Sequence, residues 1–167
     1  MDKALELIIS VYNDPDQAKA TLKALRHEAG HDTFKIKDAA VITKDKEGHA
    51  HIHDSEDVKP GHGALFGAIT GAVVGMMAGP AGVVVGAAAG AATGGVTAKA
   101  LDFGFPDEQL KAIRAGLAPN SSALVVLVEH TWAEKLVHEM EKSTGKLYRH
   151  AVDPALVDEY EREALRR

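Results

Sequence analysis

Three histidines occur at alternate positions in one short segment of the chain, as His49, His51 and His53. In a β-strand, alternate side chains point to the same face, so these three imidazoles would share one face. Neutral imidazole is a ligand for zinc, copper and nickel. Same-face side chains on one strand lie about 6.6 Å apart, so we expect only two of the three to share one ion. The spacing therefore makes these three histidines candidates for a metal site.

Two other interpretations of the same histidines stay open. The simplest is a solvated polar face, with Ala50 and Ile52 turned inward. The other is a surface that responds to pH, because histidine titrates at about pH 6.5. The formal net charge is −5 with nine neutral histidines, so protonation of all nine would bring it to +4.

Residue types elsewhere in the chain argue against catalysis and against a nucleic-acid partner. The chain has no cysteine, which excludes thiolate chemistry, and no serine lies in a nucleophile-elbow pattern. The net charge is −5 and the isoelectric point is about 6.0, whereas a nucleic-acid-binding protein carries a basic face. We therefore expect a protein that is not an enzyme, with no catalytic residue and no cofactor.

The histidines belong to the first of two strand–helix–strand patterns. Asp14, Pro15 and Gln17 follow a buried apolar run and predict a helix start with Asp14 as its N-cap. Lys44–Gly48 is typical of a hairpin turn, with Gly48 available for a positive φ. The strands expected in this half are Ala4–Val11, Phe34–Thr43 and His49–Asp54.

The second half repeats the pattern. Thr131 and Glu134 form a second capping box, and Asp153 with Pro154 predicts the start of a last helix. Two such units side by side predict an α+β, ferredoxin-like fold, a duplicated βαβ with an antiparallel sheet and helices on one face. The other elements expected in this half are the strands Ser122–Glu129 and Lys146–Val152 and a short helix, Pro106–Leu117.

Between the two halves, glycine recurs every fourth residue in a segment that has no charged residue from 63 to 98. This spacing places the glycines on one stripe of a helix, so two helices can approach backbone to backbone. We expect an inserted Gly/Ala-rich helical hairpin, a glycine zipper reversed at Pro80, that drives homo-oligomerisation. The residues assigned to oligomerisation are Gly63, Gly67, Gly71, Gly75, Gly79, Pro80, Gly82, Gly86, Gly90 and Gly94.

Each expected hairpin helix lies at the short limit for crossing a membrane. Gly63–Gly79 would be about 25 Å long and Ala81–Ala98 about 27 Å, against a hydrocarbon core of about 30 Å. Lys59 and Lys99 flank the hairpin on one side, which by the positive-inside rule would place both termini in the cytoplasm. The alternative is a soluble oligomer that buries the hairpin between its subunits.

Several segments resemble a bacterial family of unknown function, DUF1269, whose members are often labelled membrane proteins. They are the glycine-rich entry GHGALFGAITGAVVGMMAGPAG, the second Gly/Ala helix and FGFPDEQLKAIRAGLAPNSSALVVLV. The pattern FxxxxLKxIxxxLxPxSSALxxLV, here Phe105–Val128, is the most specific part. The resemblance covers most of the chain and implies membrane association, but it implies no activity.

We therefore expect three regions: residues 1–60 as the first half of a ferredoxin-like domain, 61–101 as the hairpin insertion, and 102–167 as the second half with a C-terminal helix. The expected function is non-enzymatic self-assembly at the inner membrane, facing the cytoplasm, with further copies of the chain and a lipid bilayer as partners. The alternative is a cytoplasmic homo-oligomer that senses a ligand or metal through His49, His51 and His53.

Overall fold

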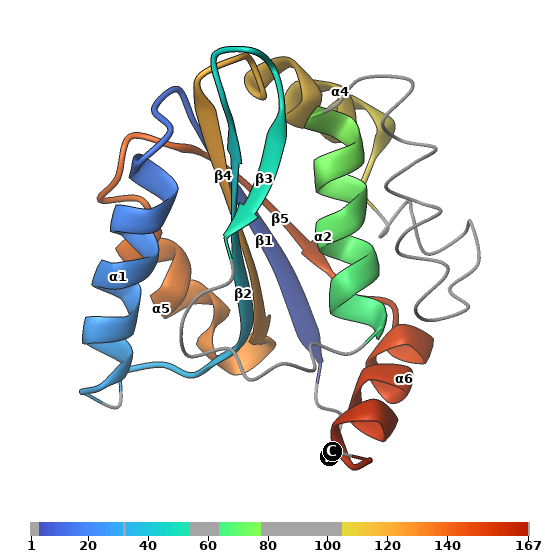
Figure 1. Ribbon diagram of the computed structural model, residues 1–167. Coiled ribbons are helices and arrows are strands. Elements are labelled where there is room, and N and C mark those ends of the chain that lie inside the picture. Colours follow the sequence, from blue (N-terminus) through green and yellow to red (C-terminus); the bar gives the residue numbers. More distant parts are fainter. Residues whose placement is uncertain (1–3, 32, 54–63, 78–104, 167) are drawn as a thin grey trace.

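A computed structural model describes residues 4–31, 33–53, 64–77 and 105–166 (Figure 1). In these residues, five strands form one antiparallel sheet in the order β3-β2-β4-β1-β5, and five helices pack around it. The strands are β1 (Leu5–Tyr12), β2 (Ile36–Lys44), β3 (Ala50–His53), β4 (Ser121–Glu129) and β5 (Lys146–Ala151). The helices are α1 (Gln17–Ala29), α2 (Ala64–Met77), α4 (Asp107–Gly116), α5 (His130–Met140) and α6 (Pro154–Ala164).

The sheet interleaves the two strand–helix–strand units. The first unit is β1–α1–β2 and the second is β4–α5–β5, and β4 lies between β1 and β2 while β1 lies between β4 and β5. Each of these neighbouring pairs is antiparallel, so the two strands of one unit run in the same direction. β3 extends the sheet beyond β2 through a tight hairpin. The α+β class and the antiparallel sheet agree with the sequence analysis.

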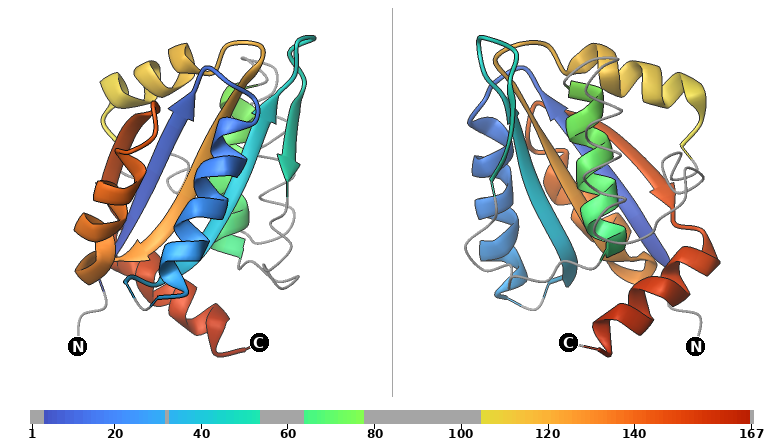
Figure 2. Two further views of the ribbon diagram at one scale, coloured as in Figure 1. Left: turned by 90° about the vertical axis from the view of Figure 1, so that its left-hand side faces the viewer. Right: turned by 45° about the vertical axis from the view of Figure 1, so that its right-hand side comes forward.

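Helices cover both faces of the sheet, whereas the sequence predicts helices on one face (Figure 2). The face that carries Ile8, Val41 and Val126 packs against α1 and α5, the two helices of the strand–helix–strand units. The opposite face packs against α2, α4 and α6. The prediction is wrong on this point because the central strands β1 and β4 are buried on both faces, as is typical of strands covered on both sides.

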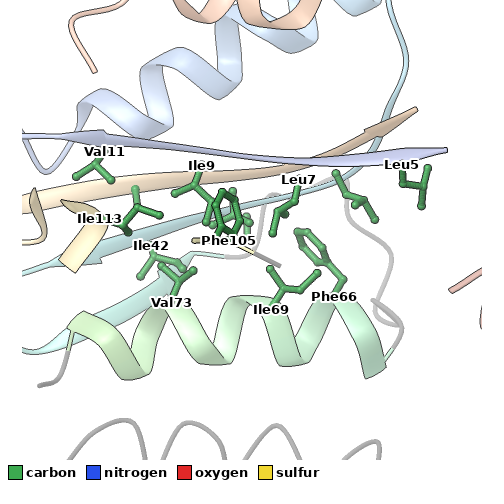
Figure 3. Packing of buried hydrophobic residues seen from close by; sticks show 14 of the residues in the cluster. Leu5, Leu7, Ile9, Val11, Ile42, Phe66, Ile69, Val73, Phe105 and Ile113 are labelled. Carbon is green, nitrogen blue, oxygen red and sulfur yellow. The ribbon is translucent and has the colours of Figure 1, made fainter. Parts of the chain in front are cut away.

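The helix α2 contributes three fully buried apolar side chains to that second face. Phe66, Ile69 and Val73 are each 1% exposed and point toward the sheet, where they meet apolar residues of β1 and β2 (Figure 3). Burial of side chains of this size stabilises a fold by about 1.5–3 kcal/mol each. The first half of the expected hairpin is therefore part of the core of the sheet domain. The second half, residues 81–98, lies outside the described residues.

Two of the three predicted helix caps are wrong. α1 begins at Gln17 with Asp16 as its N-cap, so Asp14 lies before the helix. The Asp14 carboxylate accepts from the backbone N–H of Asp16 at 2.8 Å, within the turn that precedes α1. α5 begins at His130 with Glu129 as its N-cap, so Thr131 and Glu134 already lie inside the helix. The third cap is confirmed, since the Asp153 side chain accepts from the Ala155 N–H at 2.8 Å with Pro154 at the first helical position.

Candidate functional site

The glycines of α2 lie on the side of the helix that faces away from the sheet. Successive helical residues are turned by about 100°, which places Gly71 and Gly75 roughly opposite the sheet-facing Phe66 and Val73, and Gly67 on the flank between the two sides. Gly67 and Gly71 are half-buried and Gly75 is buried. The sheet therefore takes the bulky side of α2 and leaves the glycine stripe on the other side.

Gly67 has open space where a side chain would extend, unlike Gly116. A Cβ added there would meet no heavy atom of the described residues within 4 Å, outside the helix's own backbone. A Cβ at Gly116, on α4, would come within 2.9 Å of Val11 Cγ1. Gly67 is therefore not required by packing within the described chain.

Of the residues assigned to oligomerisation, the described structure contains Gly67, Gly71 and Gly75. The others, namely Gly63, Gly79, Pro80, Gly82, Gly86, Gly90 and Gly94, lie outside the described residues. Over the described part of the chain, none of the helices has both the length and the apolar character needed to cross a membrane.

The three histidines of the metal prediction lie at the β2–β3 hairpin and are exposed. β3 pairs with β2 so that His51 lies opposite Thr43 and His53 opposite Val41. Val41 belongs to the apolar cluster on the α1 side, so His51 and His53 point to that face. The predicted alternation is confirmed for these two, whereas His49 precedes β3. Ile52 points to the other face but remains 47% exposed.

Asp45 brings two of these histidines together. Its Oδ2 atom lies 2.9 Å from His51 Nε2 and 3.4 Å from His49 Nδ1, and its Oδ1 accepts from the His49 backbone N–H at 2.8 Å. His53 instead forms a hydrogen bond with the hydroxyl of Thr43, at 2.8 Å. Among the described residues, no group of three or more His, Cys, Asp or Glu side chains could hold a metal ion. The prediction of a metal site therefore gains no support from these contacts.

Asp45 also fixes the hairpin to the rest of the sheet. The backbone carbonyl of Asp45 accepts from Gly48 at 3.1 Å and from Asn120 at 3.2 Å, which joins the turn to the segment before β4. Gly48 has a φ of 91°, the positive value expected for it in the turn. The side chain of Lys44 donates to the carbonyl of Leu117, at the end of α4.

Hydrogen bonds from the His51 side chain and then from the His49 backbone lower the pKa of Asp45 from 3.8 to about 2. A carboxyl with a lowered pKa in the folded state contributes stability above pH 3.8, and the contribution is lost as pH falls through about 2. We therefore expect the His49 amide proton resonance to shift between pH 4 and pH 1 with a midpoint of about 2. In an Asp45→Asn variant that transition should disappear, and a midpoint of 3.8 in the native chain would contradict the account.

A second charged cluster lies beneath α5. Glu6 on β1 is 4% exposed, and its carboxylate contacts His130 Nδ1 and accepts from Arg149 Nε at 3.0 Å. Arg149 also donates to Glu134 Oε1 at 2.6 Å, and Glu134 and Glu6 together raise the pKa of Arg149. Glu6 is thus a buried carboxylate neutralised by a cation from β5. The cluster fastens β1, β5 and α5 together.

Sequence reasoning missed one further group, at the end of α1. His27, Glu28 and His31 form the spacing H-E-x-x-H, and the rings of the two histidines meet edge to face. A search for histidines four residues apart on a predicted helix would have found the pair.

One comparison with known proteins gives a match. Residues 59–165 match the model of a family described as "Protein of unknown function (DUF1269)". No curated protein and no solved structure matches the chain. The matched residues include α2, the expected second Gly/Ala helix and the whole of the second strand–helix–strand unit.

Proposed function

The chain belongs to the DUF1269 family, and because that family has no assigned activity, we propose from the geometry that the protein is non-enzymatic and self-assembling. Its copies associate through the glycine stripe that begins on α2. The observation that carries the proposal is the position of Gly67, outside the sheet-facing side of α2 and beside open space in the described chain.

The composition of α2 supports a partner on its outer side. The helix has no charged residue, and a helix that is apolar all round is normally buried all round. The sheet covers one side only, through Phe66, Ile69 and Val73. Glycine in a helix costs about 1 kcal/mol relative to alanine, and close contact between helix backbones would offset that cost.

We further infer that the sheet domain has the ferredoxin-like plan, with the glycine-rich segment inserted between its two halves. The strand order β2-β4-β1-β5 and the two helices α1 and α5 on one face support this plan. β3 then adds an edge strand, and α2 adds cover to the second face. In this scheme, residues 1–60 and 102–167 form the domain and residues 61–101 form the assembling insertion.

Membrane association enters the proposal through the same segment. Since α2 packs its bulky side on the sheet and its glycine side on another copy of the chain, a bilayer would contact residues 81–98, which carry no charge. The sheet domain would then lie on the cytoplasmic side. The alternative function, ligand or metal sensing by a soluble oligomer, is less favoured because His53 binds Thr43 while His49 and His51 bind Asp45.

Replacing Gly67 with leucine tests the assembly surface directly. The leucine side chain has room in the described chain and replaces a residue of poor helix propensity, so the variant should fold. It would keep helix backbones apart at the stripe, so we expect the molar mass measured by light scattering to fall toward the 17.7 kDa of one chain.

The matched control is Ala112→Leu, which adds the same side chain to an exposed position on α4. Its assembly mass should equal that of the native protein. If Gly67→Leu keeps the native mass as well, the glycine stripe of α2 is not the interface and the proposal fails.

A further inference from the structure

The last turn of α1 places two histidines one helical turn apart with a glutamate beside the first. α1 ends at Ala29, and its C-cap, Gly30, keeps helical angles of φ −61° and ψ −17°. The backbone N–H of His31 then donates to the carbonyl of Glu28 at 3.0 Å, so the chain continues to turn through His31. The rings of His27 and His31 therefore project from the same side of the helix end.

The separation of the two rings matches that of two imidazoles on one metal ion. Their centroids lie 5.1 Å apart, with an angle of 65° between the ring planes. Two imidazoles that bind one tetrahedral zinc through nitrogens at about 2.1 Å have ring centres about 5 Å apart. We propose that His27 and His31 bind a divalent transition-metal ion of the class that prefers imidazole, with zinc as the representative.

Glu28 is placed to orient one of the ligands. Its Oε1 atom lies 3.7 Å from His27 Nδ1, within reach of an ion pair but beyond a hydrogen bond. Metal-binding histidines commonly direct their second ring nitrogen toward a carboxylate, which fixes the ring and strengthens the ligand. This arrangement leaves His27 Nε2 for the ion, and we assign Glu28 as a positioning residue.

The site is open to solvent. The side chain of His27 is 75% exposed and His31 is exposed, so an ion can enter directly and keep water in its remaining coordination positions. The C-terminal end of α1 and the β2–β3 turn lie at opposite ends of the sheet, so this site is separate from His49 and His51 (Figure 1). The proposal does not depend on self-association.

Zinc titration of the full chain by calorimetry tests the proposal, carried out in a His49→Ala/His51→Ala background to remove the two hairpin imidazoles that contact Asp45. We expect that background to bind zinc, and His27→Ala or His31→Ala to weaken the affinity by about tenfold or more. Glu28→Gln should weaken it by about tenfold without changing the thermal unfolding of the metal-free protein.

The matched control is His138→Ala, which removes an exposed histidine from α5. That variant should bind zinc as its parent does. The proposal is overturned if the parent binds no zinc, or if the loss of His27 and the loss of His138 change the affinity equally.

Discussion

Gly145→Ala is expected to lower the free energy of unfolding by about 3 kcal/mol, the upper part of the range for overpacking a core. Gly145 directly precedes β5, and an added Cβ would lie 2.7 Å from Tyr12 Cδ1 and closer still to Tyr12 Cε1 and Ser10 Oγ. Tyr12 is 2% exposed and Ser10 is 1% exposed, so neither side chain can move into solvent. Urea unfolding of the purified protein measures the difference.

The comparison variant is Gly116→Ala, on α4. There the added Cβ would meet only the Val11 side chain, at 2.9 Å from Cγ1. Alanine also gains about 1 kcal/mol over glycine inside a helix, which offsets part of the clash. A loss at Gly145 no larger than that at Gly116 would show that the turn before β5 can open without cost to the sheet.

Arg149→Met is expected to cost about 3 kcal/mol, because it leaves the buried carboxylate of Glu6 without its main cation. Two nitrogens of Arg149 contact Glu6, with Nη2 lying 2.9 Å from Oε2, and the carboxylate is almost fully removed from water. His130 is the other partner of Glu6. The measurement is the free energy of unfolding in urea at neutral pH.

Two further variants separate burial of the charge from loss of the arginine side chain. Glu134→Gln changes the other partner of Arg149. The Glu134 side chain is 80% exposed, so this variant should lower the free energy of unfolding by less than about 1 kcal/mol. A Glu6→Gln/Arg149→Met double variant should recover part of the loss, since it removes the buried charge itself. If the double variant is less stable than Arg149→Met alone, an unpaired carboxylate is not the cause.

The strands were predictable because their signals are local. The apolar runs at residues 5–12 and 121–129 and the turn at Gly48 each set the backbone of their own segment. The same holds for Asp153, whose side chain caps the helix that begins at the next residue by binding the N–H of Ala155. The bounds of these elements agree with the sequence analysis to within two residues at nearly every end.

The predictions that failed depend on residues far apart in the sequence. The N–H of Ala18, near the start of α1, bonds to the hydroxyl of Ser122 on β4. Glu134 binds Arg149 on β5 and so does not act as the partner of a capping box. The helix α2 has no charged side that would mark its solvent-facing surface. Its sequence therefore could not predict which side of the helix would lie on the sheet.

In the candidate sites too, features set by neighbouring residues were predictable, whereas those that depend on distant residues were not. Alternation alone placed His51 and His53 on one face, as predicted. The role of Asp45 between His49 and His51 depends on the closure of the hairpin, which spacing along a strand does not reveal. The glycine stripe was visible in the sequence, but its position opposite the sheet required the packing of Phe66, Ile69 and Val73.

The most direct test of self-assembly is the molar mass of the native, untagged chain by light scattering, in buffer and in mild detergent. The account predicts a mass that is a multiple of 17.7 kDa in at least one of the two conditions and that persists on dilution. A mass of one chain in both conditions, at every concentration, would contradict it.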